Sequence, residues 1–178
     1  MTLVERLAEA KRTGDYQALL DAVPYSRLLG LSARLDRNSA PPGGGAARSG
    51  DAGPFEGDEL ITTMRFAAHL IGNPALPALH GGALGALLES AAIFELFYRA
   101  ETVVLPKTIT ITVDFLRSGG PVDTHARGVV TRHGRRVANV RVEAWQADRS
   151  APVATAHAIF LVTPATPAEK PPPAAASS

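Results

Sequence analysis

The chain has 178 residues, enough for one domain with short extensions, and 46% of them are hydrophobic, as in ordinary globular proteins. Its net charge of +1 gives no basic field that would attract nucleic acid, and the absence of cysteine excludes disulfides, thiolate catalysis and cysteine-based zinc sites. Charged residues interrupt every apolar run near the N-terminus. We therefore expect neither a signal peptide nor a membrane anchor, and a cytoplasmic protein without nucleic-acid or membrane partners.

The first 24 residues are predicted to form a helical extension, 1–24, ahead of the main domain. Apolar residues recur at helical spacing over residues 2–23, and Pro24 is expected to end that segment. The residues that follow are short apolar pieces, which predict a turn of helix and then a first strand at 30–37.

The main domain is predicted to span residues 25–164. It contains a stretch rich in glycine and proline, 38–57, which has too few apolar residues to be packed and is expected to be a mobile loop. A strand is expected over 58–68. The proline-rich end of the chain, 165–178, is predicted to be a disordered tail.

One long helix is predicted over residues 81–99. Its residues are apolar or small on every side, a pattern typical of a helix that is buried all round. No other stretch combines this length with so few charges, but the prolines just before the helix argue against a membrane span.

Four strands are predicted after the helix. In residues 108–116 apolar and polar residues alternate, which predicts one buried face formed by Ile109, Ile111, Val113 and Phe115. The later segments, 122–131, 136–146 and 153–163, also alternate, and short connections between them predict an antiparallel meander. The whole pattern indicates an α+β fold with an antiparallel sheet curled around one central helix.

Glu89 is the first candidate functional residue because it is the only charged residue between Arg65 and Glu95. None of its helical neighbours three or four positions away can pair with it. Burying a lone carboxylate costs several kcal/mol unless it is neutralised or paired. One interpretation is that this side of the helix meets solvent or an arginine of a partner chain; the other is a carboxylate in a cleft with a raised pKa, acting as base or nucleophile.

The sequence His80-Gly81-Gly82 begins the same helix. Free N–H groups and the helix dipole at a helix start favour negative charge, so an oxyanion formed at a thioester carbonyl would be stabilised there. The glycines would let a substrate approach the backbone without a Cβ in the way. The simpler interpretation is a tight turn with His80 as a polar cap.

Other polar residues offer weaker signals. Asn73 precedes a proline and reads as a turn residue, with binding of a carbonyl or a water as the alternative. Arginines near two strand ends are either solvated or a basic patch for the phosphates of a nucleotide-bearing ligand; they are Arg117, Arg132, Arg135 and Arg136. The remaining histidines are too far apart in sequence to suggest a metal site.

Together these residues resemble the PaaI-type hotdog-fold acyl-CoA thioesterases of the 4HBT superfamily. The resemblance covers residues 25–164 and is carried by the stretch 73–90, in which His-Gly-Gly is followed by an acid nine residues after the histidine. The strand at 107–119 and the hairpin at 130–137 also match. The family implies five or six antiparallel strands wrapped on a helix, and a homodimer or dimer of dimers with active sites at the interface.

By position, Glu89 resembles the family's catalytic acid and Gly81 the backbone donor that polarises the thioester carbonyl. His80 resembles the residue that lines this site, and Asn73 the amide residue of the opposite subunit. The resemblance implies acyl-CoA as substrate and no further cofactor, since CoA is part of the substrate. Two positions depart from the family: Asn73 is seven rather than six residues before the histidine, and Ile93 stands where members often carry Ser or Thr.

Two alternatives to hydrolysis stay open. A non-catalytic acyl-CoA-binding protein of the same fold is favoured by Ile93, which cannot hydrogen-bond a water or a thioester. A hydratase or dehydratase would need an acid and a histidine side by side. His80 and Glu89 are ~13 Å apart along the helix, so one chain does not supply that pair.

Overall fold

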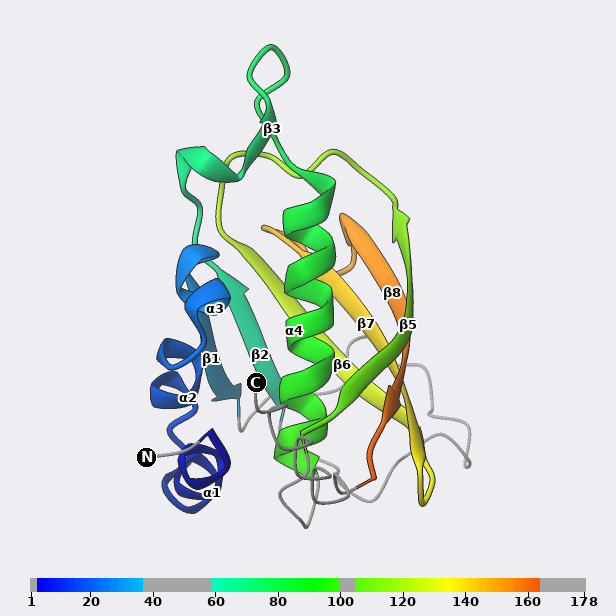
Figure 1. Cartoon of the computed structure of the whole chain (residues 1–178). Helices are drawn as coiled ribbons and strands as arrows, with labels where there is room; N and C mark the ends of the chain where they lie inside the picture. Colours follow the sequence, from blue (N-terminus) through cyan, green and yellow to red (C-terminus); the bar gives the residue numbers. More distant parts are fainter. Residues whose placement is uncertain (1–2, 37–58, 100–104, 164–178) are drawn as a thin grey trace, which may run out of the picture.

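The computed structural model describes residues 3–36, 59–99 and 105–163. A six-stranded antiparallel sheet curves around one long helix, α4 (Gly81–Arg99), which confirms the predicted α+β hotdog fold (Figure 1). The predicted loop 38–57 and tail 165–178 lie outside the described residues. The strands follow the order β1-β2-β6-β7-β8-β5 across the sheet, with bounds β1 (Leu31–Asp36), β2 (Glu59–Met64), β5 (Lys107–Phe115), β6 (Thr124–His133), β7 (Val137–Trp145) and β8 (Ala154–Leu161).

The N-terminal extension forms two helices, α1 (Leu3–Thr13) and α2 (Gln17–Asp21), beside the β1 edge (Figure 1). Gly14 ends α1 because it adopts a φ of 76°, which glycine tolerates without strain. Pro24 follows α2 as predicted but also starts a third helix, α3 (Pro24–Leu28), where its missing N–H is not needed. The ring of Tyr16 meets that of Tyr98 edge-on at 6.2 Å, so the extension packs against the end of α4.

Strand β5 departs from the predicted meander. Strands β6, β7 and β8 are consecutive neighbours, but β5 pairs with β8 and forms an edge of the sheet instead of lying beside β6. An edge strand has a neighbour on one side only, so its side chains are less covered. The predicted buried face of β5 is accordingly wrong for Ile109 and Phe115, which are each 57% exposed.

The predicted inward faces of β7 and β8 are confirmed. Their small and branched residues pack under α4, and the most deeply buried side chains of this core include Leu87, Leu88, Val140 and Phe160, each 0% exposed. Alanines dominate the inward positions of β8, which lets the helix lie close to the sheet.

Helix α4 is not buried all round, contrary to the prediction. Ten of its residues are buried against the sheet, but the stripe with Gly82, Gly85, Glu89 and Ile93 is only partly covered. By length and composition, α4 is also the one helix in the described residues that could cross a membrane, with half of its apolar window buried inside the fold. The open stripe places Glu89 within reach of solvent and of β5.

A small hairpin precedes α4 and was not predicted. The 3-10 helix η1 (Ala68–Leu70) leads into β3 (Ile71–Asn73), which pairs with β4 (Ala78–Leu79). The hairpin projects beyond the helix start (Figure 1). Its prolines and short strands carry no alternating apolar pattern, which explains why only a turn was predicted here.

Candidate active site

The start of α4 leaves one backbone donor unused. The carbonyl oxygen of His80 accepts the N–H groups of Ala83 and Leu84, and its ring Nδ1 accepts the N–H of Gly82 at 2.9 Å. Within the part of the chain that the structure describes, the N–H of Gly81 has no acceptor. His80 therefore acts as the predicted cap, and Gly81 is the donor available to an external oxygen.

A side chain at either glycine of the helix start would crowd the side chain of a neighbour. A Cβ on Gly81 would lie 3.1 Å from the Phe115 ring, and a Cβ on Gly82 would lie 2.9 Å from His80 Nδ1. The Phe115 ring thus flanks the free N–H of Gly81. The predicted role of Gly82 as a point of close approach is compatible with its exposure, but its own N–H is already bonded to His80.

Glu89 is half-buried on the open stripe of α4 and has a partner that sequence reasoning missed. The hydroxyl of Thr108 at the start of β5 donates a hydrogen bond of 2.7 Å to Glu89 Oε1. A hydroxyl donor stabilises a carboxylate and restricts its rotamers. The carboxylate is therefore held in place by a polar contact instead of being isolated in an apolar interior.

A β-bulge explains why Thr108 faces the helix. Thr108 pairs with Phe160 and Thr110 with Ile159, so Ile109 is skipped in the register. The extra residue shifts the alternation, and Thr108 joins the helix-facing side together with Ile111 and Val113. Bulges commonly re-aim a side chain beside an active site. Regular alternation would have put Ile109 there, as the sequence had predicted.

The carboxylate and the free N–H are far apart in one chain. Eight residues separate Gly81 from Glu89, which corresponds to about 12 Å along a helix. A carbonyl oxygen bound at the Gly81 N–H is therefore beyond the direct reach of Glu89 on the same helix.

Asn73 has the local role that its position before a proline suggested. Its Oδ1 accepts the N–H of Ala75 at 3.0 Å, a side-chain-to-backbone bond that closes the turn of the projecting hairpin. The residue is exposed, and its partner across the hairpin is Ala78, two residues before His80. Its side-chain oxygen is engaged within the hairpin turn.

The four arginines separate into two groups. Arg117, at the exit of β5 near Phe115, donates to the Pro152 carbonyl oxygen at 2.7 Å and is on the Gly81 side of the molecule. The β6–β7 hairpin carries the other three, which are exposed: Arg132, Arg135 and Arg136.

That hairpin lies at the opposite end of β5. Val137 pairs with Leu161, which pairs in turn with Lys107 at the start of β5, whereas Phe115 at its end touches Gly81. Eight residues of strand span about 26 Å. The hairpin arginines and Gly81 are therefore not part of one site within a single chain.

The deeply buried carboxylate of α4 is Glu95, six residues beyond Glu89. Burial raises the pKa of Glu95, and the bonded Arg99, whose Nε lies 2.7 Å from Glu95 Oε1, opposes that shift. The described residues hold no group of three His, Asp or Glu side chains that could bind a metal ion.

The chain matches the sequence model of the acyl-CoA thioesterase N-terminal domain over residues 72–161. This segment contains α4, both glycines, Glu89 and Thr108, and the match covers half of the chain. The fold and the helix-start site thus define a hotdog thioesterase-type protein. The chain belongs to this acyl-CoA thioesterase family.

Solved structures of similar proteins share this fold. A protein from Chromobacterium violaceum is 34% identical, with a TM-score of 0.62 over 91% of this chain and 99% of that one. PaaI of the Escherichia coli phenylacetic acid degradation operon is 16% identical, with a TM-score of 0.61 over 91% and 96%. A hypothetical thioesterase from Streptococcus pneumoniae, solved with coenzyme A, is 17% identical, with a TM-score of 0.53 over 60% and 82%. No curated protein matches the chain.

Proposed function

We propose that the protein hydrolyses an acyl-CoA thioester to a free acid and CoA. The observation that carries the proposal is that one helix presents both an unused N–H, at Gly81, and a half-buried carboxylate, at Glu89. Family membership supports thioester chemistry, and coenzyme A in the pneumococcal structure supports a CoA-bearing ligand. CoA belongs to the substrate, so the reaction needs no other cofactor, and we propose a cytoplasmic location.

In this mechanism the thioester carbonyl oxygen accepts the Gly81 N–H. Negative charge develops on that oxygen as the carbonyl carbon is attacked, and the positive end of the α4 dipole stabilises it. Glu89 takes the proton of an attacking water, or attacks directly and is released by water in a second step. The carbon–sulfur bond then breaks, and the CoA thiolate leaves and is protonated.

The Thr108 hydroxyl supplies a contact that Ile93 cannot. It donates to Oε1 of Glu89 and leaves Oε2 to accept a proton from water. The hydroxyl that many family members carry one helical turn after the acid is thus replaced by one from β5. We therefore treat Thr108 as a positioning residue for Glu89.

We propose that the working unit is a homodimer, or a dimer of such dimers, because one chain leaves about 12 Å between its donor and its carboxylate. Strand β5 is an unpaired edge in the single chain, and Ile109 on it is exposed. Antiparallel pairing of two β5 edges would place the Lys107 end of one chain beside the Phe115 end of the other. The partner's Glu89 and its hairpin arginines would then approach Gly81, where the arginines would bind CoA phosphates. Asn73, in the hairpin beside the helix start of the same chain as Gly81, would lie on the subunit opposite to that Glu89.

The proposed hydrolysis is tested with the substitution Glu89→Gln, which keeps the shape of the side chain and removes the base. We expect thiol release from acyl-CoA to fall by about 10²–10⁴-fold. The matched control is Asp21→Asn on α2, an exposed carboxylate at the other edge of the molecule, which should leave the rate unchanged. A Glu89→Gln variant with the wild-type rate would show that Glu89 is not the catalytic carboxylate.

The proposed dimer is tested with Ile109→Lys, which puts a charge on the exposed β5 edge. We expect light scattering to show monomers, circular dichroism to show an intact fold, and thiol release to be lost. The control is Ala8→Lys, an exposed position on α1 at the other edge of the molecule, which should stay oligomeric. A fully active monomer would contradict a shared site.

A non-catalytic acyl-CoA-binding protein is the second candidate, favoured by Ile93 and by the distance between Gly81 and Glu89 in one chain. Tight binding of acyl-CoA without release of thiol, across short, medium, long and aromatic acyl groups, would favour it over hydrolysis. Formation of hydroxyacyl-CoA instead of free CoA would indicate a hydratase.

A further inference from the structure

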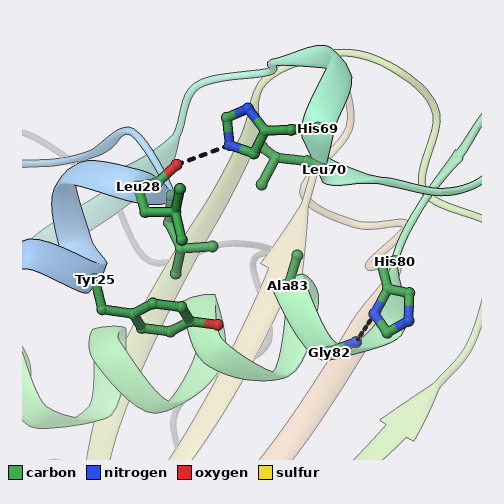
Figure 2. Close-up of a pocket in the computed structure, with 8 residues that line it drawn as sticks. Tyr25, Leu28, His69, Leu70, His80, Gly82 and Ala83 are labelled. Carbon is green, nitrogen blue, oxygen red and sulfur yellow. Dashed lines mark hydrogen bonds between the residues drawn. The ribbon is translucent and has the colours of Figure 1, made fainter.

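A hollow of about 330 Å³ lies between α3, η1 and the start of α4 (Figure 2). Residues of α3 form one side, η1 closes it above, and the first turn of α4 forms the other side. The lining residues are Tyr25, Leu28, Leu29, His69, Leu70, His80, Gly82 and Ala83. At the lower end of the roughly 300–1,000 Å³ of ligand pockets, this volume suits part of an acyl-CoA but not the whole molecule.

Apolar or aromatic side chains make up five of the eight residues that line the hollow. Leucines from α3 and η1 face it together with Ala83 and the Tyr25 ring. Tyr25 and Leu28 lie three residues apart on α3 and are 55% and 56% exposed. Covering such side chains with an apolar ligand removes their hydrocarbon from water, which is favourable.

Two polar atoms of the lining are engaged within the protein. His69 Nε2 is hydrogen-bonded to the Leu28 carbonyl oxygen at 2.8 Å, and His80 Nδ1 accepts the Gly82 N–H at 2.9 Å. The lining contains no lysine, arginine or carboxylate. A charged acyl group would therefore find no side chain of opposite charge in this lining.

The position of the hollow connects it to the proposed chemistry. Gly82 lines it and is adjacent to Gly81, whose N–H is the proposed donor to the thioester carbonyl. With no side chain at Gly82, an acyl chain can pass from that carbonyl over the helix start into the hollow. Five of the eight lining residues, from Tyr25 to Leu70, precede residue 72, where the family match begins.

We propose that this hollow binds the acyl group, and that Tyr25 and Leu28 select uncharged hydrocarbon acyl groups of limited size. The inference rests on the proposed thioesterase function, which it extends by naming the substrate class. Because α3 carries both residues on its exposed side, substitutions there change the size of the hollow without opening the core.

The test uses two substitutions of opposite effect in the full chain. Leu28→Trp narrows the hollow, and Tyr25→Ala widens it. With acetyl-, hexanoyl- and decanoyl-CoA, we expect Leu28→Trp to lower kcat/KM for the two longer substrates by about tenfold or more, with acetyl-CoA unchanged. Tyr25→Ala should shift the preference toward decanoyl-CoA. The control, Val122→Trp, introduces the same side chain at an exposed residue between β5 and β6 and should leave the profile unchanged.

A chain-length profile that neither variant changes, or an equal loss on all three substrates, would overturn the inference while leaving the thioesterase proposal intact. If the wild-type protein cleaves none of them, the proposed function fails first. Binding of non-cleavable acyl-CoA thioethers of the same three lengths then decides the inference. Weaker binding of only the longer thioethers to Leu28→Trp would support the hollow as the acyl site, and equal binding would refute it.

Discussion

Among the described residues, the Thr108 hydroxyl is the hydrogen-bond donor that holds the Glu89 carboxylate, so its removal should affect turnover more than binding. We expect Thr108→Val to lower kcat by about 10–100-fold, with a smaller change in KM. This loss is smaller than the one expected for Glu89→Gln, which removes the base itself. Because Thr108 is exposed, the fold should be preserved. Steady-state thiol release gives both constants.

Two further variants separate positioning from structure. Thr108→Ser keeps the hydroxyl and should restore most of kcat. Thr110→Val makes the same change two residues along β5, where the residue pairs with Ile159 and faces away from the helix, and should have no effect. Equal losses for Thr108→Ser and Thr108→Val would show that the hydroxyl does not hold Glu89.

For individual residues, the sequence indicated Glu89 as a functional residue but did not indicate its hydrogen-bond partner, Thr108. Glu89 was recognisable because a single charge stood in an apolar helix, and Gly81 because its type and place suit a helix-start donor. Thr108 was hidden because strict alternation put Ile109 on the helix side. A bulge depends on pairing with a strand about fifty residues later in the chain, which local pattern does not contain.

Helix α4 and strand β6 approach each other closely at Gly128. A Cβ there would lie 2.9 Å from Glu95 Cβ and 3.2 Å from the Ala91 carbonyl oxygen, both parts of the helix. We expect Gly128→Ala to lower the free energy of unfolding by roughly 1–3 kcal/mol, because neither strand nor helix backbone can move away freely. Urea denaturation followed by circular dichroism measures this change.

Gly85 on the open stripe of α4 is the matched control. An added Cβ there meets nothing within 4 Å, and alanine is favoured over glycine inside a helix by roughly 0.5–1 kcal/mol. Gly85→Ala should therefore keep or raise the free energy of unfolding. A Gly128→Ala variant as stable as the wild type would mean that the helix and sheet are not as closely packed as the structure shows.

The elements that alternate or repeat over many residues were predictable, and those set by neighbours were not. Helix α4, β7 and β8 follow directly from periodic apolar residues. The exposure of β5 and the open stripe of α4 arise because β5 became an edge beside β8, and sequence periodicity carries no information on which strands become neighbours. The same limit left the β3–β4 hairpin unpredicted.

Buried charges connect several parts of the whole molecule. Glu59 of β2 forms ion pairs of 2.7 Å with Arg127 of β6 and with Arg149 after β7, and Arg149 also lies 4.8 Å above the Trp145 ring. Glu95 of α4 is near this network: Arg99 and Arg127 favour its ionised form, and Glu59 disfavours it. Burial raises the pKa of Tyr16 in the N-terminal extension to about 12, and the nearby Tyr98 and Glu95 contribute to this increase.

The raised pKa of Glu95 predicts a pH dependence of stability with a definite sign. Its folded pKa lies above the ordinary value of 4.5, so its contribution to stability is complete below pH 4.5 and is lost as the pH rises through the folded pKa. The variant Glu95→Gln lacks this titration and can still accept the Arg99 hydrogen bond. The free energy of unfolding of the wild type, minus that of Glu95→Gln, should therefore decrease from pH 4.5 upward in urea titrations. Glu9→Gln is the control of opposite sign, because the bonded Arg12 lowers the pKa of Glu9, and that difference should increase with pH. A Glu95 difference that stays constant or increases would mean that the network charges outweigh its burial.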